Sequence, residues 1–500
     1  MKIPIFFVAA AYALCCFASQ GAKPNIVLIN ADDLGWAEVG CYGQKKIKTP
    51  HIDKLAAQGQ KWTYFYSGAP VCSPSRNVLM TGRHTGVNDV QDLKRVDPGE
   101  SWDDLRAGDW PIAKDAYTLP EALKKAGYAT AIFGKWGIGE FGTTGAPDKH
   151  GVDRFYGYTD QKACHSYYPP FIWDDGEKVA LNKKNPPATI GHIFGPLPKG
   201  EINADDYRGE IHSSDLIADK MLEFVKARSD HKQPFFLYYA PLEPHVPLQP
   251  TQKWIDEYPT KWDPTPFRGG TGYLPHPRPK AAYAAMISQM DHNVGRLLDT
   301  LKACGLENNT IVIFTSDNGT THDVGGVDHK FFNSVAGLRG LKGQLYEGGI
   351  RVPGIIKWPG KVTPGTIIDQ PAYHADIMPT LCAIVGAKPG KPLGTDLTPV
   401  ILGKKKSLPN RNPMVWAGGG YGGQVAVRLG DMKIVRRNLF PKKKPNNWEV
   451  YDISKDPFEK NNLAAQHRDL IDKAIAILKA HGEDAYRLGT IVEGDGVELV

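Results

Sequence analysis

Carboxylate and amide side chains that could bind a metal ion occur in two short segments of this 500-residue chain. Asp32 and Asp33 follow one apolar run, and Asp317 and Asn318 follow another. If the fold brings three carboxylates together, they repel one another, and some of them must take up protons. A hard divalent cation removes that repulsion, and oxygen ligands suit Ca²⁺, or Mg²⁺, better than Zn²⁺. The residue types therefore predict a calcium or magnesium site.

Three cationic side chains lie in segments that contain Gly or Pro: Arg76, Lys135 and Lys342. Taken singly, each of them is expected to be a charged residue on the protein surface. Beside a metal ion, however, they would clamp a tetrahedral oxyanion and stabilise the charge that moves in a transition state. The combination indicates a sulfate ester or a phosphate ester as the substrate.

One cysteine lies where an anion-binding helix is expected to begin. Cys72 is followed by Pro74, which we place in the first turn of a short helix. The free N–H groups and the dipole of a helix N-terminus favour a bound anion. An isolated cysteine beside proline is more often a small buried apolar residue, so the surrounding motif must distinguish the two interpretations.

Four short apolar runs predict strands that are buried on both faces; they cover residues 25–30, 128–133, 235–240 and 310–315. Helical segments with capping signals lie between them, at residues 118–127, 211–228 and 280–304. Strands that alternate with helices form a mainly parallel α/β sheet. Ligands bind beyond the carboxyl ends of such strands. We therefore expect the polar groups that follow these strands to converge at one sheet edge.

In the segment around Cys72, the motif Cys72-x-Pro-Ser-Arg is followed by Leu-x-Thr-Gly-Arg83. This motif resembles the signature of the type I sulfatases, a family of the alkaline-phosphatase-like superfamily in which this cysteine is converted to formylglycine. Further similar segments cover nearly the whole chain beyond the N-terminus; they are residues 25–35, 49–56, 133–136, 244–247, 315–319, 338–342 and 346–353. The resemblance implies a bacterial carbohydrate sulfatase with a mixed, mainly parallel sheet between helices and a small C-terminal α+β domain on an antiparallel sheet.

The resemblance also implies roles for the matched residues. The implied metal ligands are Asp32, Asp33, residue 72, Asp317 and Asn318, and the implied catalytic residues are Cys72, Arg76, Lys135, His245 and Lys342. One hydroxyl of the hydrated formylglycine would attack sulfur, and His245, helped by Lys342, would protonate the leaving sugar oxygen. A base would then take a proton from the second hydroxyl, which expels sulfate. A formylglycine-generating maturase is therefore an expected partner.

One position departs from the family pattern. Family members commonly carry His two residues after the lysine of residue 135, whereas this chain has Gly137, which cannot act as a base. Either another histidine enters the site, or the protein is slow or is a non-catalytic sugar-binding relative. We favour His165 as the substitute base or as a substrate contact, and a surface or structural role for it stays open; the other candidates are His150, His322 and His329.

The chain has the organisation expected of an exported enzyme. Residues 1–22 combine a lysine, an apolar stretch and small residues, which is typical of a secretory signal peptide. The stretch is short for a membrane span, and we expect none in the mature chain, which would be periplasmic or secreted. We divide the rest into a catalytic domain, residues 23–405, and a C-terminal α+β subdomain, residues 406–500 with its last helix at 466–481. A basic, Pro-rich linker joins them.

Net charge and the predicted export limit the classes of partner and substrate that we expect. The net charge of +6 is small for this length, so no nucleic-acid partner is expected. Export fits sulfated polysaccharides or their fragments, cleaved in exo fashion with a galactose-type sulfate as the first guess; a phosphodiesterase or phosphonate hydrolase is the alternative. Two interpretations are open for a cluster of aromatic residues, which either stack on a sugar ring of the substrate or pack in the core. The cluster consists of Tyr167, Tyr168, Phe171 and Trp173. The sequence leaves open whether disulfide bonds form among Cys41, Cys164, Cys304 and Cys382.

Overall fold

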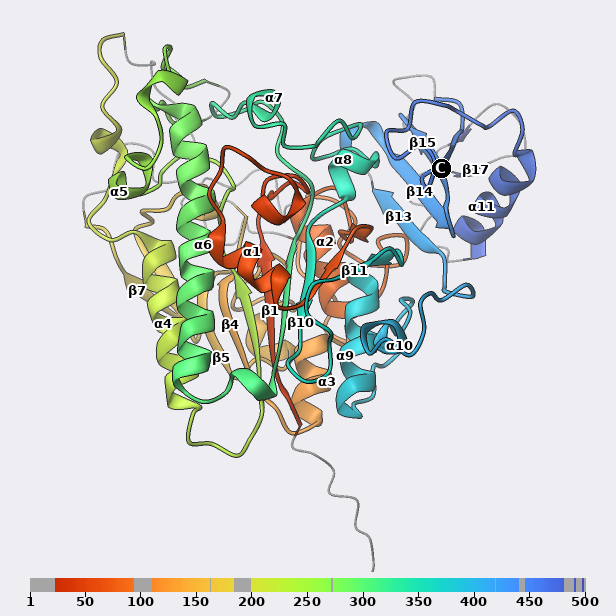
Figure 1. Cartoon of the computed structure of the whole chain (residues 1–500), viewed down its shortest axis with the longest axis horizontal. Coiled ribbons are helices and arrows are strands. Elements are labelled where there is room, and N and C mark those ends of the chain that lie inside the picture. Colours follow the sequence, from red (N-terminus) through yellow and green to blue (C-terminus); the bar gives the residue numbers. More distant parts are fainter. Residues whose placement is uncertain are drawn as a thin grey trace, which may run out of the picture.

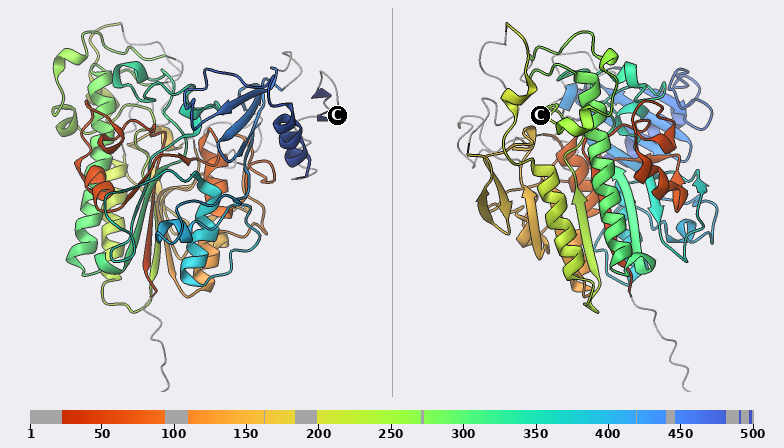
Figure 2. Two further views of the ribbon diagram at one scale, coloured as in Figure 1. Left: turned by 45° about the vertical axis from the view of Figure 1, so that its right-hand side comes forward. Right: turned by 60° about the vertical axis from the view of Figure 1, so that its left-hand side comes forward.

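The computed structural model describes residues 23–93, 110–161, 163–183, 199–270, 273–418, 420–439 and 446–480, together with two short strands near the C-terminus. The predicted signal peptide lies outside the described residues. Two sheets organise the chain: a large mixed sheet between two layers of helices, and a smaller antiparallel sheet at one end (Figures 1 and 2). None of the described helices is both long enough and apolar enough to cross a bilayer.

Ten strands form the large sheet. Their spatial order is β11 (Thr366–Ile368), β2 (Gln60–Trp62), β10 (Gly354–Lys357), β9 (Thr310–Ser316), β1 (Asn25–Ala31), β8 (Phe235–Ala240), β4 (Ala129–Lys135), β5 (Arg154–Tyr158), β6 (Phe171–Asp174) and β7 (Glu177–Ala180). The five from β9 to β5 are all parallel, whereas β10, β6 and β7 pair antiparallel to a neighbour. The four strands predicted from apolar runs are β1, β4, β8 and β9, and they are adjacent, so this prediction is confirmed.

Helices cover both faces of this sheet because alternate residues of its strands point to opposite sides. Val27 and Ile29 of β1 pack with helices on one face, and Ile26 and Leu28 pack with helices on the other. The first layer contains α1 (Pro50–Ala57), α4 (Ser213–Ala227) and the long α6 (Pro279–Ala303); the second contains α2 (Cys72–Thr81), α3 (Leu119–Lys125), α9 (Ile377–Val385) and α10 (Thr398–Ile401). The helices predicted around residues 118–127, 211–228 and 280–304 are α3, α4 and α6.

The remaining elements are short. Four of the helices have four residues each: α5 (Gln252–Ile255), α7 (His329–Phe332), α8 (Glu347–Ile350) and α10. Two-residue strands make two small pairs: β3 (Phe65–Tyr66) with β12 (Ala372–Tyr373), and β17 (Thr490–Ile491) with β18 (Val497–Glu498).

The C-terminal sheet packs between a helix and the catalytic part. It consists of β13 (Met414–Gly418), β14 (Gln424–Leu429), β15 (Met432–Arg437) and β16 (Glu449–Asp452), all antiparallel. Val427 and Ile434 face α11 (Arg468–Ala480), whereas Trp416 and Ala426 face the catalytic part beside Tyr66. The predicted α+β appendage on an antiparallel sheet is confirmed (Figure 2).

All five cysteines of the described residues are free thiols: Cys41, Cys72, Cys164, Cys304 and Cys382. The pairing that the sequence left open is therefore absent among them.

Candidate active site

The carboxyl ends of β1 and β9 bring the predicted metal-binding segments together. β1 leads into Asp32 and Asp33, and the adjacent parallel strand β9 leads into Asp317 and Asn318. The backbone N–H of Asp33 donates to Oδ1 of Asp317 at 3.1 Å. Asp33 has a φ of +65°, a strained conformation for a residue with a side chain and one that concentrates at functional sites. All four side chains are fully buried.

Helix α2 places Cys72 against these carboxylates. The helix begins at Cys72 and ends at Thr81, and it is capped by Gly82, whose φ of +66° suits a glycine C-cap. The Sγ atom lies 3.5 Å from Oδ1 of Asp32 and 3.9 Å from Oδ1 of Asp33. Ligand atoms of Asp32, Asp33, Cys72 and His245 all lie within 4.8 Å of one another. Burial raises the pKa of the Cys72 thiol above its usual range, so the unmodified side chain is a neutral, weak nucleophile.

Arg76, one turn after Cys72, directs its guanidinium donors inward. Its Nε and Nη2 both donate to Oδ2 of Asp317, at 3.0 and 2.8 Å. Its Nη1 donates to the carbonyl oxygen of Lys135 at 2.7 Å and lies 3.4 Å from the Tyr238 hydroxyl. Arg76 therefore ties α2 to the ends of β9 and β4.

Two lysines neutralise the other two carboxylates. Nζ of Lys135 lies 2.5 Å from Oδ2 of Asp32, and Nζ of Lys342 lies 2.7 Å from Oδ1 of Asp33 and 3.5 Å from Sγ of Cys72. Burial alone would raise the pKa values of Asp32 and Asp33, but these cations outweigh it and hold both below the usual range. The pKa of Asp317 is raised to about 6 by burial and by Asp32.

His245 presents one ring nitrogen to the same group of side chains. Its Nδ1 lies 2.7 Å from the carbonyl oxygen of Val246 and must donate to it, because a carbonyl oxygen only accepts. Its Nε2 therefore faces Asp33, with 3.7 Å between Nε2 and Oδ2. Burial lowers the pKa of His245 to about 4, although Asp33 opposes this shift.

Asn318 supplies an observation that fits a cation. Its Nδ2 donates to Oδ1 of Asp33 at 2.7 Å and to the carbonyl oxygen of Gly319 at 2.9 Å, which fixes the orientation of the amide. Its Oδ1 is buried and has no hydrogen-bond donor among the described residues. A buried acceptor without a donor is costly, whereas a carbonyl-type oxygen beside carboxylates is a donor set that Ca²⁺ or Mg²⁺ prefers.

Comparison with known proteins identifies this arrangement. The family described as Sulfatase matches residues 24–387, and the family described as N-sulphoglucosamine sulphohydrolase, C-terminal, matches residues 341–480. The chain belongs to the sulfatase family. This sulfatase is thus a sulfuric ester hydrolase, and its fold is that of the alkaline-phosphatase-like superfamily.

The relatives of this sulfatase include proteins named as N-acetylgalactosamine 6-sulfatases. It is 30% identical to the N-acetylgalactosamine-6-O-sulfatase of Bacteroides thetaiotaomicron, with 92% of this chain and 93% of that protein covered. It is 31% identical to the N-acetylgalactosamine-6-sulfatase of Rattus norvegicus, over 77% and 67%. The crystal structure of Ps i-CgsB in complex with k-i-k-neocarrahexaose has a TM-score of 0.72 and 26% identity, with 93% of each chain covered. A phosphonate monoester hydrolase of Agrobacterium radiobacter shares the fold, with a TM-score of 0.61 and 21% identity.

The side chain of Gln161 occupies the space beside Gly137. Gly137 has a φ of +72°, and a Cβ atom on it would lie 2.5 Å from Nε2 of Gln161. That Nε2 donates to the Ser73 hydroxyl at 2.8 Å, so Gln161 contacts the first turn of α2 next to Cys72. Gln161 was missed in the sequence, although it follows β5 as Asp32 follows β1; the short, Gly-containing β5 was not recognised as a strand.

Among the histidines considered as a substitute base, His165 lies beside His245, and the other three lie elsewhere in the fold. The rings of His165 and His245 are 4.7 Å apart between centroids and nearly perpendicular. His150 is buried with both ring nitrogens near backbone carbonyls, which is a structural role. Nδ1 of His329 lies 2.5 Å from Oδ1 of Asp323 at the start of α7. His322 is half-buried near the Lys342 segment.

The aromatic cluster divides between core and edge. Tyr167 and Tyr168 are 1% and 4% exposed and belong to the core. The Tyr167 hydroxyl lies 2.8 Å from the carbonyl oxygen of His245 and so supports the loop that carries this histidine. Phe171 and Trp173 lie on β6 with their ring centroids 5.9 Å apart. Tyr167 and Tyr168 are therefore unavailable for stacking on a sugar.

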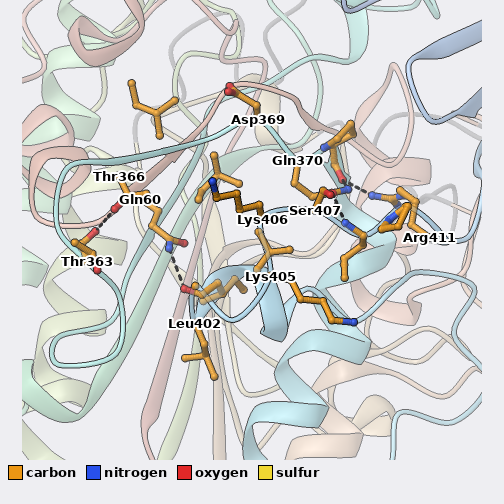
Figure 3. A pocket seen from close by; sticks show the side chains of 18 of the residues that line it. Gln60, Thr363, Thr366, Asp369, Gln370, Leu402, Lys405, Lys406, Ser407 and Arg411 are labelled. Carbon is orange, nitrogen blue, oxygen red and sulfur yellow. Dashed lines mark hydrogen bonds between the residues drawn. The ribbon is translucent and has the colours of Figure 1, made fainter.

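A cavity of about 670 Å³ lies along the sheet edge formed by β11 (Figure 3). Residues 361–371 form one side of it and residues 400–411 the other, while Gln60 donates across it to the carbonyl oxygen of Ile401 at 2.9 Å. It shares no lining residue with the group around Cys72, so the two are separate features.

Proposed function

We propose that this sulfatase hydrolyses sulfate monoesters of sulfated sugars and uses a formylglycine formed from Cys72. One observation carries the proposal: Cys72 begins a helix and lies 3.5 Å from Asp32, among buried carboxylates that two lysines and Arg76 neutralise. Burial raises the pKa of the unmodified Cys72 thiol above its usual range, and the modified residue is the proposed reacting group. A maturase that modifies the Cys72 motif is then a required partner.

We further propose Ca²⁺, with Mg²⁺ as the alternative, as the ion of this site. Asp32, Asp33, Asp317, Asn318 and residue 72 would hold it, and the unpartnered Oδ1 of Asn318 supports this set. The bound cation would polarise the oxygens around it and attract the anionic ester. Three carboxylates and three cationic side chains already balance in charge, so a divalent cation makes the site positive, as an anionic substrate needs.

The surrounding side chains have complementary roles in this proposal. Arg76 and Lys135 fix the positions of residue 72 and of the neighbouring carboxylates, because both side chains are buried and directed into the site. Lys342 and His245 are slightly more exposed, at 8% and 5%, and both face Asp33. His245 would give the Nε2 proton to the leaving sugar oxygen, with its ring held by the Val246 carbonyl. His165, beside His245, would serve as the substitute base or contact the substrate.

The substrate is proposed to be a galactose-configured sugar sulfate outside the cytoplasm. The named activities of the relatives, directed at N-acetylgalactosamine 6-sulfate, support this class. The segment 1–22 supports export by its sequence alone.

The test compares ester classes with the matured full chain. Protein produced with a maturase is given N-acetylgalactosamine 6-sulfate, related sugar sulfates and a phosphate monoester and diester. Released sulfate or phosphate is measured for the monoesters, and released alcohol for the diester. Sulfate release that disappears in Cys72→Ala and falls on chelation is expected. Faster release of phosphate than of sulfate would favour a phosphate or phosphonate ester hydrolase. No release of either anion, with sugar binding retained, would favour the non-catalytic relative.

A further inference from the structure

One half-exposed aromatic residue of the C-terminal sheet has an unusual backbone. Tyr421 lies in the connection between β13 and β14, residues 419–423, which has the sequence Gly-Gly-Tyr-Gly-Gly. Its φ and ψ are 55° and 34°, the left-handed region that residues with side chains rarely adopt. Its side chain is 50% exposed, although large aromatic residues are usually buried. Glycine would meet the backbone requirement without strain, so the presence of tyrosine calls for a role of its side chain.

The ring of Tyr421 lies against the segment that carries Lys342. A Cβ atom on Gly343 would lie 2.3 Å from Cζ of Tyr421, so the ring contacts the backbone directly after the catalytic lysine. The neighbouring Gln424 donates to the carbonyl oxygen of Gly343 at 2.6 Å, and the N–H of Gly343 donates to the carbonyl oxygen of Pro70 at 2.8 Å. The strand that follows the loop is thus bonded to Gly343, and Gly343 is itself bonded to Pro70, two residues before Cys72.

A second ring lies at an angle to the first. His322 and Tyr421 have ring centroids 6.2 Å apart and an interplanar angle of 76°. Burial raises the pKa of Tyr421, and Lys342 and Asp33 act on that pKa in opposite directions, which shows that the ring lies within range of the charges of the site. Both rings thus lie within electrostatic range of Lys342 and Asp33, the charged pair beside residue 72.

We propose that Tyr421, with His322 beside it, is the platform on which the sugar ring of the substrate stacks. The proposal rests on the proposed function and names a specificity-determining residue from the C-terminal sheet. Apolar faces of a sugar ring fit an aromatic face, and the Tyr421 hydroxyl can bond to a sugar hydroxyl at the wet end of the ring. The buried Tyr167 and Tyr168 cannot take this role, whereas Tyr421 is accessible.

The experiment separates sugar binding from sulfate binding. Tyr421→Ala is expected to lower kcat/KM for N-acetylgalactosamine 6-sulfate about tenfold, and Tyr421→Phe should restore most of it because the ring is kept. Inorganic sulfate is too small to reach the platform, so its inhibition constant should change less than twofold in either variant. Phe458→Ala is the matched control: Phe458 is also a half-exposed aromatic that packs on a glycine, Gly337.

Two results would overturn the platform. One is a kcat/KM of Tyr421→Ala within twofold of the parent; the other is an equal loss of sulfate inhibition, which would mean a distorted site. If the matured parent releases no sulfate, the proposed function fails by itself, and the platform is then tested by calorimetric binding of the same sugar sulfate to Cys72→Ala with and without Tyr421→Ala. Equal dissociation constants there would overturn it, and about tenfold weaker binding would support it.

Discussion

At the scale of single residues, the three carboxylates of the site are neutralised by three cationic side chains of the protein itself. Asp32, Asp33 and Asp317 are fully buried, and each has a cationic partner within 3 Å. Removing one partner of a buried ion pair leaves an uncompensated charge, which costs more than the pair gains. We therefore expect substitutions here to reduce stability as well as activity, and the informative variants are those at the less buried rim.

His245 is one such rim residue. If it protonates the leaving oxygen, His245→Asn lowers kcat roughly a hundredfold or more for sugar sulfates. The loss should be much smaller for 4-nitrophenyl sulfate, because nitrophenolate leaves without a proton. Burial lowers the pKa of His245 to about 4, so its protonated form declines as pH rises. We expect kcat/KM for sugar sulfates to fall with rising pH, and this dependence to weaken in the variant. Equal losses for both leaving groups would refute the role.

His165 is tested by the order in which products leave. A substitute base acts after the sugar has departed, so His165→Gln should release the first equivalent of sugar at the parental rate and sulfate slowly. Rapid-quench measurements of both products detect this burst. Many turnovers at the parental rate would contradict the assignment, and an equal slowing of both products would indicate a substrate contact instead.

At the scale of elements, a buried ion cluster joins the C-terminal sheet to the catalytic part. Lys433 of β15 lies 3.0 Å from Glu347 at the start of α8 and 2.9 Å from Glu459. The backbone N–H of Glu347 also donates to Glu459 at 2.8 Å. This cluster fixes α8, which directly follows the Lys342 segment, and the same sheet carries the loop of Tyr421.

Lys433→Met should therefore destabilise the whole molecule, because it removes the cation nearest to two buried carboxyl groups and leaves Glu347 with the longer pair to Arg351, at 3.7 Å. We expect a loss of about 3–5 kcal/mol in the free energy of unfolding, measured by urea denaturation. Lys455→Met is the control within the same part of the chain: Lys455 pairs with Asp452 at the surface, where ion pairs add little to stability, and no measurable change is expected. A Lys433 variant as stable as this control would show that the cluster does not hold the two parts together.

At the scale of the whole molecule, three buried carboxyls in different regions give one dependence on pH. Burial raises the pKa values of Glu243, Asp291 and Glu459 to about 7. The folded chain thus holds protons that the unfolded chain releases between about pH 4 and pH 7. Folding stability is complete below that window and declines as pH rises through it.

The melting temperature should consequently fall between pH 5 and pH 8, by several degrees at fixed calcium concentration. Glu243→Gln removes the titration of one group and should flatten the curve, with the larger gain in stability at pH 8. Differential scanning calorimetry measures both. A melting temperature that rises steadily from pH 5 to pH 8 would contradict the assignment of these buried acids.

A structural feature of this protein can be predicted from the sequence when the residues that form it are close together along the chain. The parallel core and the convergence of Asp32, Lys135 and Asp317 were predictable, because apolar strands and the polar residues after them are adjacent in sequence. Gln161 beside Gly137 and Tyr421 beside Gly343 were not. Each pairs residues from separate strand connections, and the contact exists only because two glycines leave space for a distant side chain.

The central claim is that residue 72 acts as a formylglycine, and one measurement tests it most directly. The full chain, produced with a maturase, is digested, and the mass of the peptide that contains residue 72 is determined alongside sulfate release from N-acetylgalactosamine 6-sulfate by the same sample. We predict the mass of the aldehyde, with sulfate release proportional to the converted fraction across preparations. Sulfate release at full rate from protein whose Cys72 is entirely an unmodified thiol would contradict the account.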